Sequence, residues 1–247
     1  MRPLLQAELL KLRTTRTFAA LTGAAVGTSL LLAVLTGLLT EPKESSVLVD
    51  VFASDTSSLF ILVLAVIGVS GEWRHRTIAG SLLAAPDRLR FLAAKTLAFA
   101  AAGLLLSIAI SIAVSIAGFA ILGVRGLPLP EAGELVELAA RSALVSALMG
   151  AFGACLGALV RNQVVAIVGV LLLSFFLEPL LLSLAPGFGR FGPFTALPTA
   201  VFDIPPEAVG LGGVNLVAPG VAGLLMLAWI GAAFAGAGAL LQRRDLE

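Results

Sequence analysis

Long apolar runs, separated by short polar or Pro/Gly-rich breaks, dominate the chain. A transmembrane helix needs roughly 20 mainly apolar residues, and runs such as Leu104–Ile110 lack the alternating polarity of a barrel strand. The pattern therefore predicts an all-α polytopic membrane protein, a single transmembrane domain over residues 1–247. Its six expected spans are 18–39, 52–71, 96–122, 138–159, 164–184 and 217–241. The second span has a short uninterrupted apolar core, Leu59–Val69, and Asp55 must lie near one of its ends.

Composition supports the same class. The 247 residues are 59% hydrophobic and only 13% charged, whereas a soluble domain carries roughly 25% charged residues. Too little polar surface is available to cover a soluble fold of this length. A soluble enzyme, a disordered tail and a disulfide scaffold are all poor fits, the last because the chain has one cysteine.

The basic residues predict the orientation. They gather before the first span, after the second, after the fourth and after the sixth, while the opposite loops hold only Lys43, Arg125 and Arg190, with Arg141 just inside the fourth span. Basic residues are retained on the cytoplasmic side of short loops. We therefore expect a multi-pass protein of the cell (inner or plasma) membrane with both termini in the cytoplasm. A cleaved signal peptide is a poor alternative, because the apolar run 18–39 exceeds about 15 residues.

The residues needed for catalysis are scarce. Lys11, Lys43 and Lys95 are the lysines, and none follows a Gly-x-x-x-x-Gly pattern, so no phosphate-binding loop is expected. One histidine and one cysteine make a zinc site a poor prospect. Because no lysine or histidine falls at membrane depth, an intramembrane serine protease is also unsupported. We expect no enzyme activity, no cofactor or metal, and no nucleic-acid partner for this chain.

The most informative segment follows the second span. Trp73, Ile78 and Leu82 recur at near-helical spacing, Glu72 precedes them, and Pro86 stops the pattern. The segment is therefore predicted to be a short amphipathic helix at the membrane surface. A simpler interpretation is that its arginines only anchor the loop to anionic lipid, at about 1 kcal/mol per cation.

The order of residues in this loop resembles that of type-2 ABC transporter permeases. The matching positions are Glu72, His75, Arg76, Thr77, Ile78, Leu82, Leu83, Pro86, Arg88 and Lys95. The resemblance implies a coupling helix within 72–95 that docks on a separate ATP-binding subunit, which would hold ATP and Mg. The residues implied in coupling are Glu72, Trp73, Arg74, His75, Arg76, Thr77, Ile78, Leu82, Leu83, Pro86 and Arg88. It also implies a second permease copy, identical or related, and re-entrant helices within 185–216.

The N-terminal segment 1–17 fits an interfacial helix. Leu5, Leu9 and Leu12 fall at i, i+4 and i+7, with Glu8 and Lys11 expected mostly on other faces. In the resembling family the equivalent segment lies along the inner membrane face. The alternative is a plain cytoplasmic lead-in stabilised by its positive charge.

Small and weakly polar residues form stripes inside the spans. Ser107, Ser111 and Ser115 repeat every fourth residue of the third span and continue the line of Gly103. Similar stripes of small residues, Gly150, Gly153 and Gly157, and Gly231 and Ala235, occur in the fourth and sixth spans. Membrane helices pack through small residues, so packing is the favoured interpretation. The serines are the better candidates for a substrate pathway, because a hydroxyl can bond a passing polar group.

Two charges fall within the spans. Glu178 lies about 21 Å along the fifth span and Arg141 about 5 Å inside the fourth, and such charges are costly unless paired. Neighbouring antiparallel spans would bring these residues close, so we expect an Arg141–Glu178 pair. The alternative is that both side chains reach the outer interface. Pro179 is expected to kink or end its helix.

The leading hypothesis is the permease subunit of an ATP-driven ABC exporter. A secondary transporter driven by an ion gradient is the first alternative; it would need buried carboxylates near the membrane centre. A noncatalytic membrane anchor or assembly protein is the second, and it leaves the loop pattern unexplained.

Overall fold

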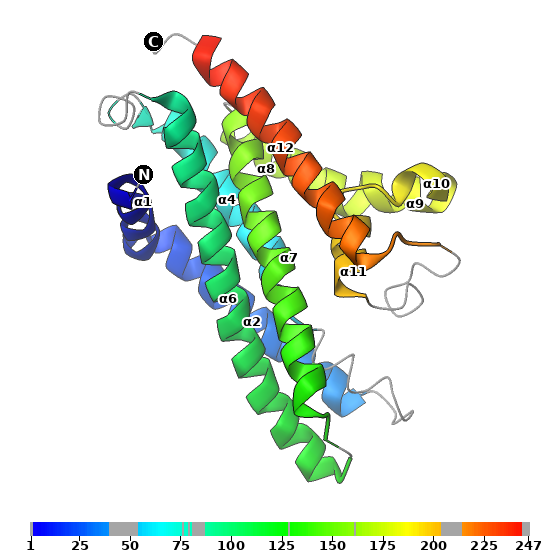
Figure 1. Ribbon diagram of the computed structural model, residues 1–247. Helices are drawn as coiled ribbons and strands as arrows, with labels where there is room; N and C mark the ends of the chain where they lie inside the picture. Colours follow the sequence, from blue (N-terminus) through cyan, green and yellow to red (C-terminus); the bar gives the residue numbers. More distant parts are fainter. Residues whose placement is uncertain are drawn as a thin grey trace.

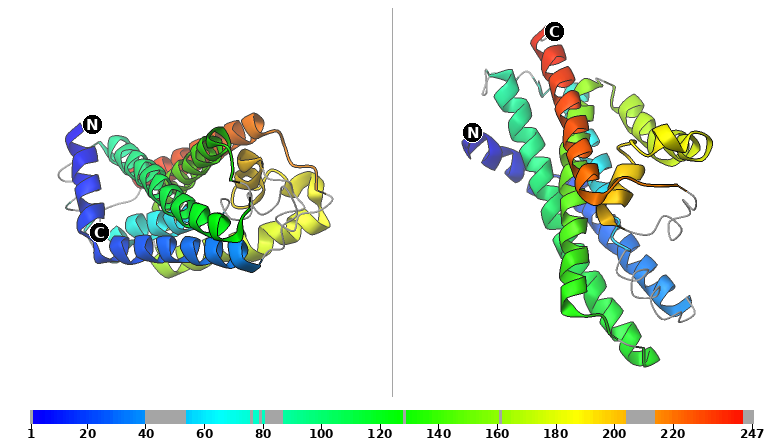
Figure 2. Two further views of the ribbon diagram at one scale, coloured as in Figure 1. Left: turned by 90° about the horizontal axis from the view of Figure 1, so that it is seen from below. Right: turned by 45° about the vertical axis from the view of Figure 1, so that its right-hand side comes forward.

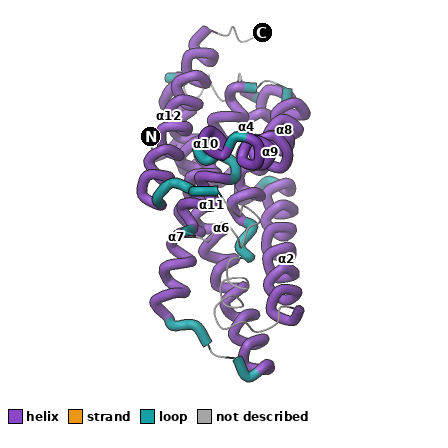
Figure 3. The backbone as a smooth tube through the Cα atoms, turned by 90° about the vertical axis from the view of Figure 1, so that its right-hand side faces the viewer, coloured by secondary structure: helices purple, strands orange, loops and turns teal. Residues whose placement is uncertain are grey.

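The computed structural model describes residues 2–39, 54–75, 77–78, 80, 87–127, 129–160, 162–203 and 214–243. These residues form helices joined by short loops, with no strand among them (Figure 3). The helices are α1 (Arg2–Thr14), α2 (Arg16–Leu39), α4 (Ser57–Arg74), α6 (Arg88–Arg125), α7 (Ala132–Leu159), α8 (Gln163–Leu172), the π-helical turn η1 (Leu173–Leu177), α9 (Glu178–Leu184), α10 (Pro186–Gly189), α11 (Ala196–Phe202) and α12 (Pro219–Arg243). The predicted all-α class is confirmed.

Six helical segments of the described chain are long and apolar enough to cross a membrane. They are α2, α4, α6, α7, the combined segment Gln163–Leu184 and α12, and they match the predicted spans with shifted ends. The largest shift is in α6, which begins at Arg88 instead of Thr96 because Asp87 accepts hydrogen bonds from the amides of Leu89 and Arg90. The chain is a polytopic membrane protein by these criteria.

The helix of the second span extends past residue 71, where the loop was predicted to begin. α4 continues to Arg74, so Glu72 and Trp73 belong to the end of a spanning helix. His75 follows in a turn, and Ile78 and Gly80 are helical. Arg76, Leu82, Leu83 and Pro86 lie outside the described residues.

α7 forms the centre of the bundle and packs against α4, α6, α11 and α12 (Figure 1). Glycines bring the backbones together: a Cβ added at Gly150 would lie 2.3 Å from the carbonyl oxygen of Phe99 on α6. A Cβ added at Gly103 on α6 would lie 2.2 Å from the carbonyl oxygen of Ser146 on α7. The packing interpretation is thus confirmed for these two helices. A Cβ at Gly231 would meet nothing within 4 Å.

α1 and the last turns of α12 lie toward one end of the bundle, together with the start of α6 (Figure 1). The turn between α6 and α7 lies at the opposite end, and α9 and α10 project to one side (Figure 2). We call the first end the charged end, for the cluster of Glu8, Lys11, Glu72 and Lys95 described below, and the second the hairpin end. An even number of spans requires the two chain ends to share one end in this way.

Pro179 changes the fifth span without ending it. The turn before it is π-helical, with the amide of Glu178 bonded to the carbonyl of Leu173, and the helix then continues to Leu184. Proline has no N–H and its ring crowds the preceding turn. The carbonyl of Ser174 therefore lacks its partner within the helix and instead accepts a hydrogen bond from the Thr195 hydroxyl at 3.1 Å.

Candidate functional site

Two acids and two lysines meet at the charged end. The Lys95 ammonium on α6 lies 2.8 Å from Oε2 of Glu8 on α1 and 2.7 Å from Oε1 of Glu72 on α4. Lys11 of α1 lies 2.8 Å from Glu8 and 3.3 Å from Glu72. This charged cluster ties three helices together, and the residues it joins are as far apart in sequence as Glu8 and Lys95.

Burial makes the cluster a firm connection. The Lys95 side chain is 2% exposed, and Glu8 and Glu72 are 11% and 12% exposed. The Lys95 ammonium also lies 4.8 Å from the centroid of the Phe91 ring, within the range of a cation–π contact. Charges this shielded from water are tolerated only when paired. α1 therefore cannot leave the bundle without exposing or unpairing Lys95.

The pKa values of the α1 side chains follow from this pairing. Burial on its own would raise the pKa of Glu8, but the Lys95 ammonium and the hydrogen bonds from Lys11 and Lys95 outweigh it, so the pKa is lowered from 4.5. Burial would lower the pKa of Lys11, but its hydrogen bonds to Glu8 and Glu72 raise it from 10.5. Both groups are thus held in their charged forms.

This pairing predicts how stability depends on pH. The stabilisation from Glu8 is fully present above about pH 4.5 and is lost as the pH falls through its lowered folded pKa. That from Lys11 is present below about pH 10.5 and is lost as the pH rises through its raised folded pKa. The difference in melting temperature between the native protein and Glu8→Gln should therefore be constant from about pH 5.5 to 9.5 and shrink in acid. A difference that persists unchanged at pH 3 would contradict this.

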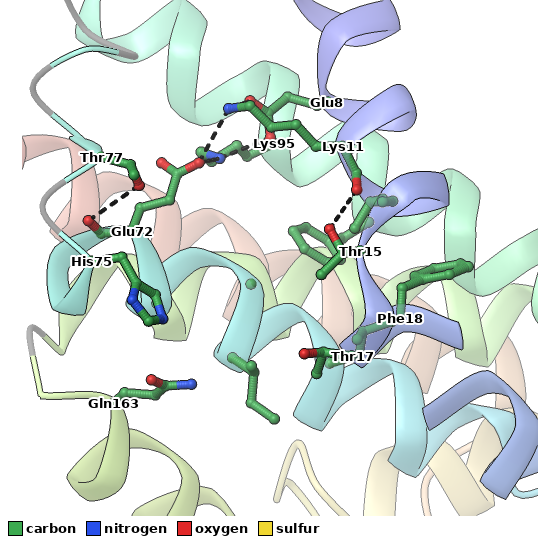
Figure 4. A pocket seen from close by; sticks show the side chains of 16 residues that line it. Glu8, Lys11, Thr15, Thr17, Phe18, Glu72, His75, Thr77, Lys95 and Gln163 are labelled. Carbon is green, nitrogen blue, oxygen red and sulfur yellow. Dashed lines mark hydrogen bonds and ion pairs between the residues drawn. The ribbon is translucent and has the colours of Figure 1, made fainter. Parts of the chain in front are cut away.

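A cavity of about 480 Å³ lies beside the charged cluster, between α1, α2, α4, α6 and the start of α8 (Figure 4). Its polar lining includes all four charged residues, with Thr15, Thr17, His75, Thr77 and Gln163. Its apolar lining is Leu12, Phe18, Leu64, Ile67 and Phe99. A cavity of this size is in the range of small-ligand sites, roughly 300–1,000 Å³.

The predicted coupling residues are distributed around this end. Trp73 packs against the core, Ile78 is buried, and Arg74 donates to Oε1 of Gln163 at 3.3 Å. The Arg88 guanidinium donates to the carbonyls of Leu241 and Gln242, so it caps the end of α12. Lys95 and Glu72 meet directly, although 22 residues separate them along the chain. The segment between them thus begins and ends on residues fixed to α1, and Arg88 within it is fixed to α12.

The serine stripe does not behave as one surface. Ser107 is fully buried and donates to Oδ2 of Asp55 at 2.6 Å, while Ser111 and Ser115 line an apolar groove between α6 and α7. Asp55 also accepts from the amide of Ser57 at 2.8 Å, and the Ser57 and Ser146 hydroxyls lie 2.5 Å apart. Ser107 therefore belongs to a buried polar cluster at the start of α4.

The predicted Arg141–Glu178 pair was wrong. The carboxylate of Glu178 accepts three hydrogen bonds of 2.8 Å, from the amides of Phe194, Thr195 and Ala196 at the start of α11. Arg141 instead binds Glu137 at 2.6 Å and Asp203 at 2.9 Å, and donates to the carbonyl of Phe202 at the end of α11. The two charges thus hold opposite ends of one short helix, the acid at its positive end and the base at its negative end.

Two important acids were missed by the sequence analysis. Glu8 was expected mostly on another face of the N-terminal helix, but it lies on the packed face between Leu4 and Leu12 and is 8% exposed. Its spacing from those leucines was the available signal, since i+3 and i+4 neighbours share a face. Asp55 was treated only as a mark against the second span, whereas its hydrogen bonds organise the polar cluster.

No protein-family model and no curated protein matches the chain. Among the described residues there is also no group of three histidine, cysteine or acidic side chains that could hold a metal ion.

Proposed function

We propose that the chain is the permease subunit of an ATP-driven ABC exporter. In this proposal the charged end faces the cytoplasm, and the segment after α4 docks on a separate ATP-binding subunit that holds ATP and Mg. Two copies of the chain, or one copy and a related chain, would form the pathway. No covalent chemistry is assigned to this chain.

The observation that carries the proposal is the pairing of Lys95 with Glu72 and Glu8. Glu72 and Lys95 are the first and last positions of the loop that resembles the coupling loop of type-2 permeases. Their contact, and the hydrogen bonds from Arg88 to the end of α12, make the base of this loop rigid. A displacement of the loop would therefore be passed to α1, α4, α6 and α12 together.

Coupling of ATP hydrolysis to transport requires a rigid connection between the docking segment and the spanning helices. A partner can shift a conformational equilibrium only if its contacts differ between the two states. His75 and Thr77 are exposed beyond the fixed end of α4, where a partner could contact them. Closure of two ATP-binding subunits would then move this end of the bundle as a unit and open the hairpin end.

Co-purification with the ATP-binding protein encoded beside this chain tests the proposal. We expect a stable complex in detergent and ATP hydrolysis that rises when the permease is present. His75→Glu with Thr77→Glu should weaken the complex, whereas Thr14→Glu, on the exposed face of α1, should not. No association under conditions where both proteins are folded would overturn the proposal.

The buried Asp55 favours one alternative. Its partner Ser107 lies about 18 Å from Lys95 along the spanning helix α6, at about 1.5 Å per residue. Such a carboxylate is expected in an ion-driven transporter. Transport that survives ATP depletion, and stops when the ion gradient is collapsed or in Asp55→Asn, would support that alternative. Partner binding without any transport would instead support an anchor or assembly protein.

A further inference from the structure

The cavity beside the charged cluster has two walls of different chemistry. Phe18 of α2, Leu64 and Ile67 of α4 and Phe99 of α6 belong to helices that can span a membrane. The polar wall comes from α1, from the last turn of α4 and from Lys95 near the start of α6, where these spans end. The apolar wall is therefore formed by the ends of the spanning helices and the polar wall lies where these helices end, which is the order of apolar and polar groups that an amphiphile would require.

The polar wall is charge-balanced. Its two carboxylates, those of Glu8 and Glu72, face two ammonium groups, those of Lys11 and Lys95. A net anionic ligand would meet two carboxylates, and a net cationic ligand would meet two ammonium groups. A zwitterion with separated positive and negative groups is the ligand whose charges the wall matches.

One acceptor in this wall is unsatisfied. Oε1 of Glu72 binds Lys95 and Lys11, but Oε2 is shielded from water and no described residue donates to it (Figure 4). A buried acceptor without a donor costs about 1–3 kcal/mol, and more if charged. A ligand that brings an N–H group to Glu72 would remove this cost, whereas a quaternary ammonium has no N–H to bring.

We propose that the cavity binds one aminophospholipid, with its headgroup ammonium at Glu72, its phosphodiester beside Lys11 and Thr15, and its acyl chains along Phe18, Leu64 and Phe99. The bound lipid would fill the space between α1 and the spans and hold α1 in place. The proposal does not depend on the ATP-binding subunit, because every residue in it belongs to this chain.

Native mass spectrometry of the protein released from nanodiscs tests the site. The nanodiscs contain equal amounts of dioleoyl phosphatidylethanolamine, phosphatidylcholine and phosphatidylglycerol. We expect one phosphatidylethanolamine per chain, retained at least about tenfold over each other lipid, as one charge-assisted hydrogen bond would give. Equal retention of the ethanolamine and choline lipids, or preferential retention of the glycerol lipid, would overturn the proposal.

Three variants and one competitor locate the binding. Thr17→Trp, from an exposed position that lines the cavity, should abolish retention, while Thr14→Trp, exposed but outside the lining, should not. Glu72→Gln should lose the preference for ethanolamine over choline. If Glu72→Gln does not fold, the tryptophan pair still decides, and equal retention in both tryptophan variants would refute the site. Displacement by soluble glycerophosphoethanolamine at an equal concentration would overturn the lipid assignment, because the acyl chains would then contribute nothing.

Discussion

Lys95→Met should destabilise the protein by about 3–5 kcal/mol, because it leaves two shielded carboxylates, Glu8 and Glu72, with only Lys11 as a described partner. Methionine keeps the length and the apolar stem of lysine, so packing is largely retained. Reversible unfolding in mixed micelles measures the loss. The same variant should uncouple the loop from α1, since Lys95 is the residue that joins α1, α4 and α6.

Lys11→Met is the matched control. Lys11 contacts the same two carboxylates, but its side chain is 50% exposed, and exposed ion pairs contribute at most about 1 kcal/mol. We therefore expect a small loss for Lys11→Met and a large one for Lys95→Met. Adding Glu8→Gln to Lys95→Met should recover part of the loss, because it removes one of the two shielded carboxylates that would otherwise share Lys11. Equal losses for the two lysine variants would refute the assignment of Lys95 as the central charge.

Glu178→Ala should cost more than about 3 kcal/mol, because three amide groups at the start of α11 lose their acceptor together. The site has no spare room for rearrangement: a Cβ at Gly192 would lie 2.3 Å from Oε1 of Glu178. α11 should then detach from the end of α9, and under the proposed function transport should fall with it. Thermal unfolding and protease sensitivity of residues 186–203 measure the two effects.

Two further variants separate the role of Glu178 as an acceptor for α11 from a general effect of losing a charge. Glu178→Gln keeps one carbonyl oxygen as an acceptor, so an intermediate loss is expected. Glu137→Ala removes the 64% exposed partner of Arg141 and should cost less than about 1 kcal/mol. A Glu178→Gln protein with native stability and full transport would show that the charge of the carboxylate is not needed at α11.

The two intramembrane charges show where sequence reasoning stops. The cost of charge in hydrocarbon was enough to single out Arg141 and Glu178. Their partners were mistaken because depth along two helices says nothing of what lies between them. In the structure that space is occupied by α11, a helix of seven residues whose ends supply the compensating dipoles. Re-entrant helices within 185–216 were expected only from the family resemblance, because a segment this short carries too little apolar periodicity to be located by its pattern.

The contacts within the charged cluster could not be predicted from the sequence either. Glu72 and Lys95 were recognised from the order of residues in one loop, and that order is local. Their connection to Glu8 crosses 87 residues and depends on how α1 lies against α6, which no local pattern contains. The start of α6 was also placed too late, because its first turns carry arginines that only the capping by Asp87 and the bond from Arg88 to α12 explain.

The sequence by itself determined the class, the six apolar spans and the close packing of glycine-bearing helices, because each depends on a run of residues or a spacing within one helix. The tertiary structure decided which charges meet, how Pro179 is absorbed by a π-helical turn, and where a cavity with an unsatisfied carboxylate oxygen lies. These depend on contacts between helices that are distant in the chain. The residues that carry the functional argument, Glu8, Glu72 and Lys95, were therefore visible as charges in the sequence but became a site only through folding.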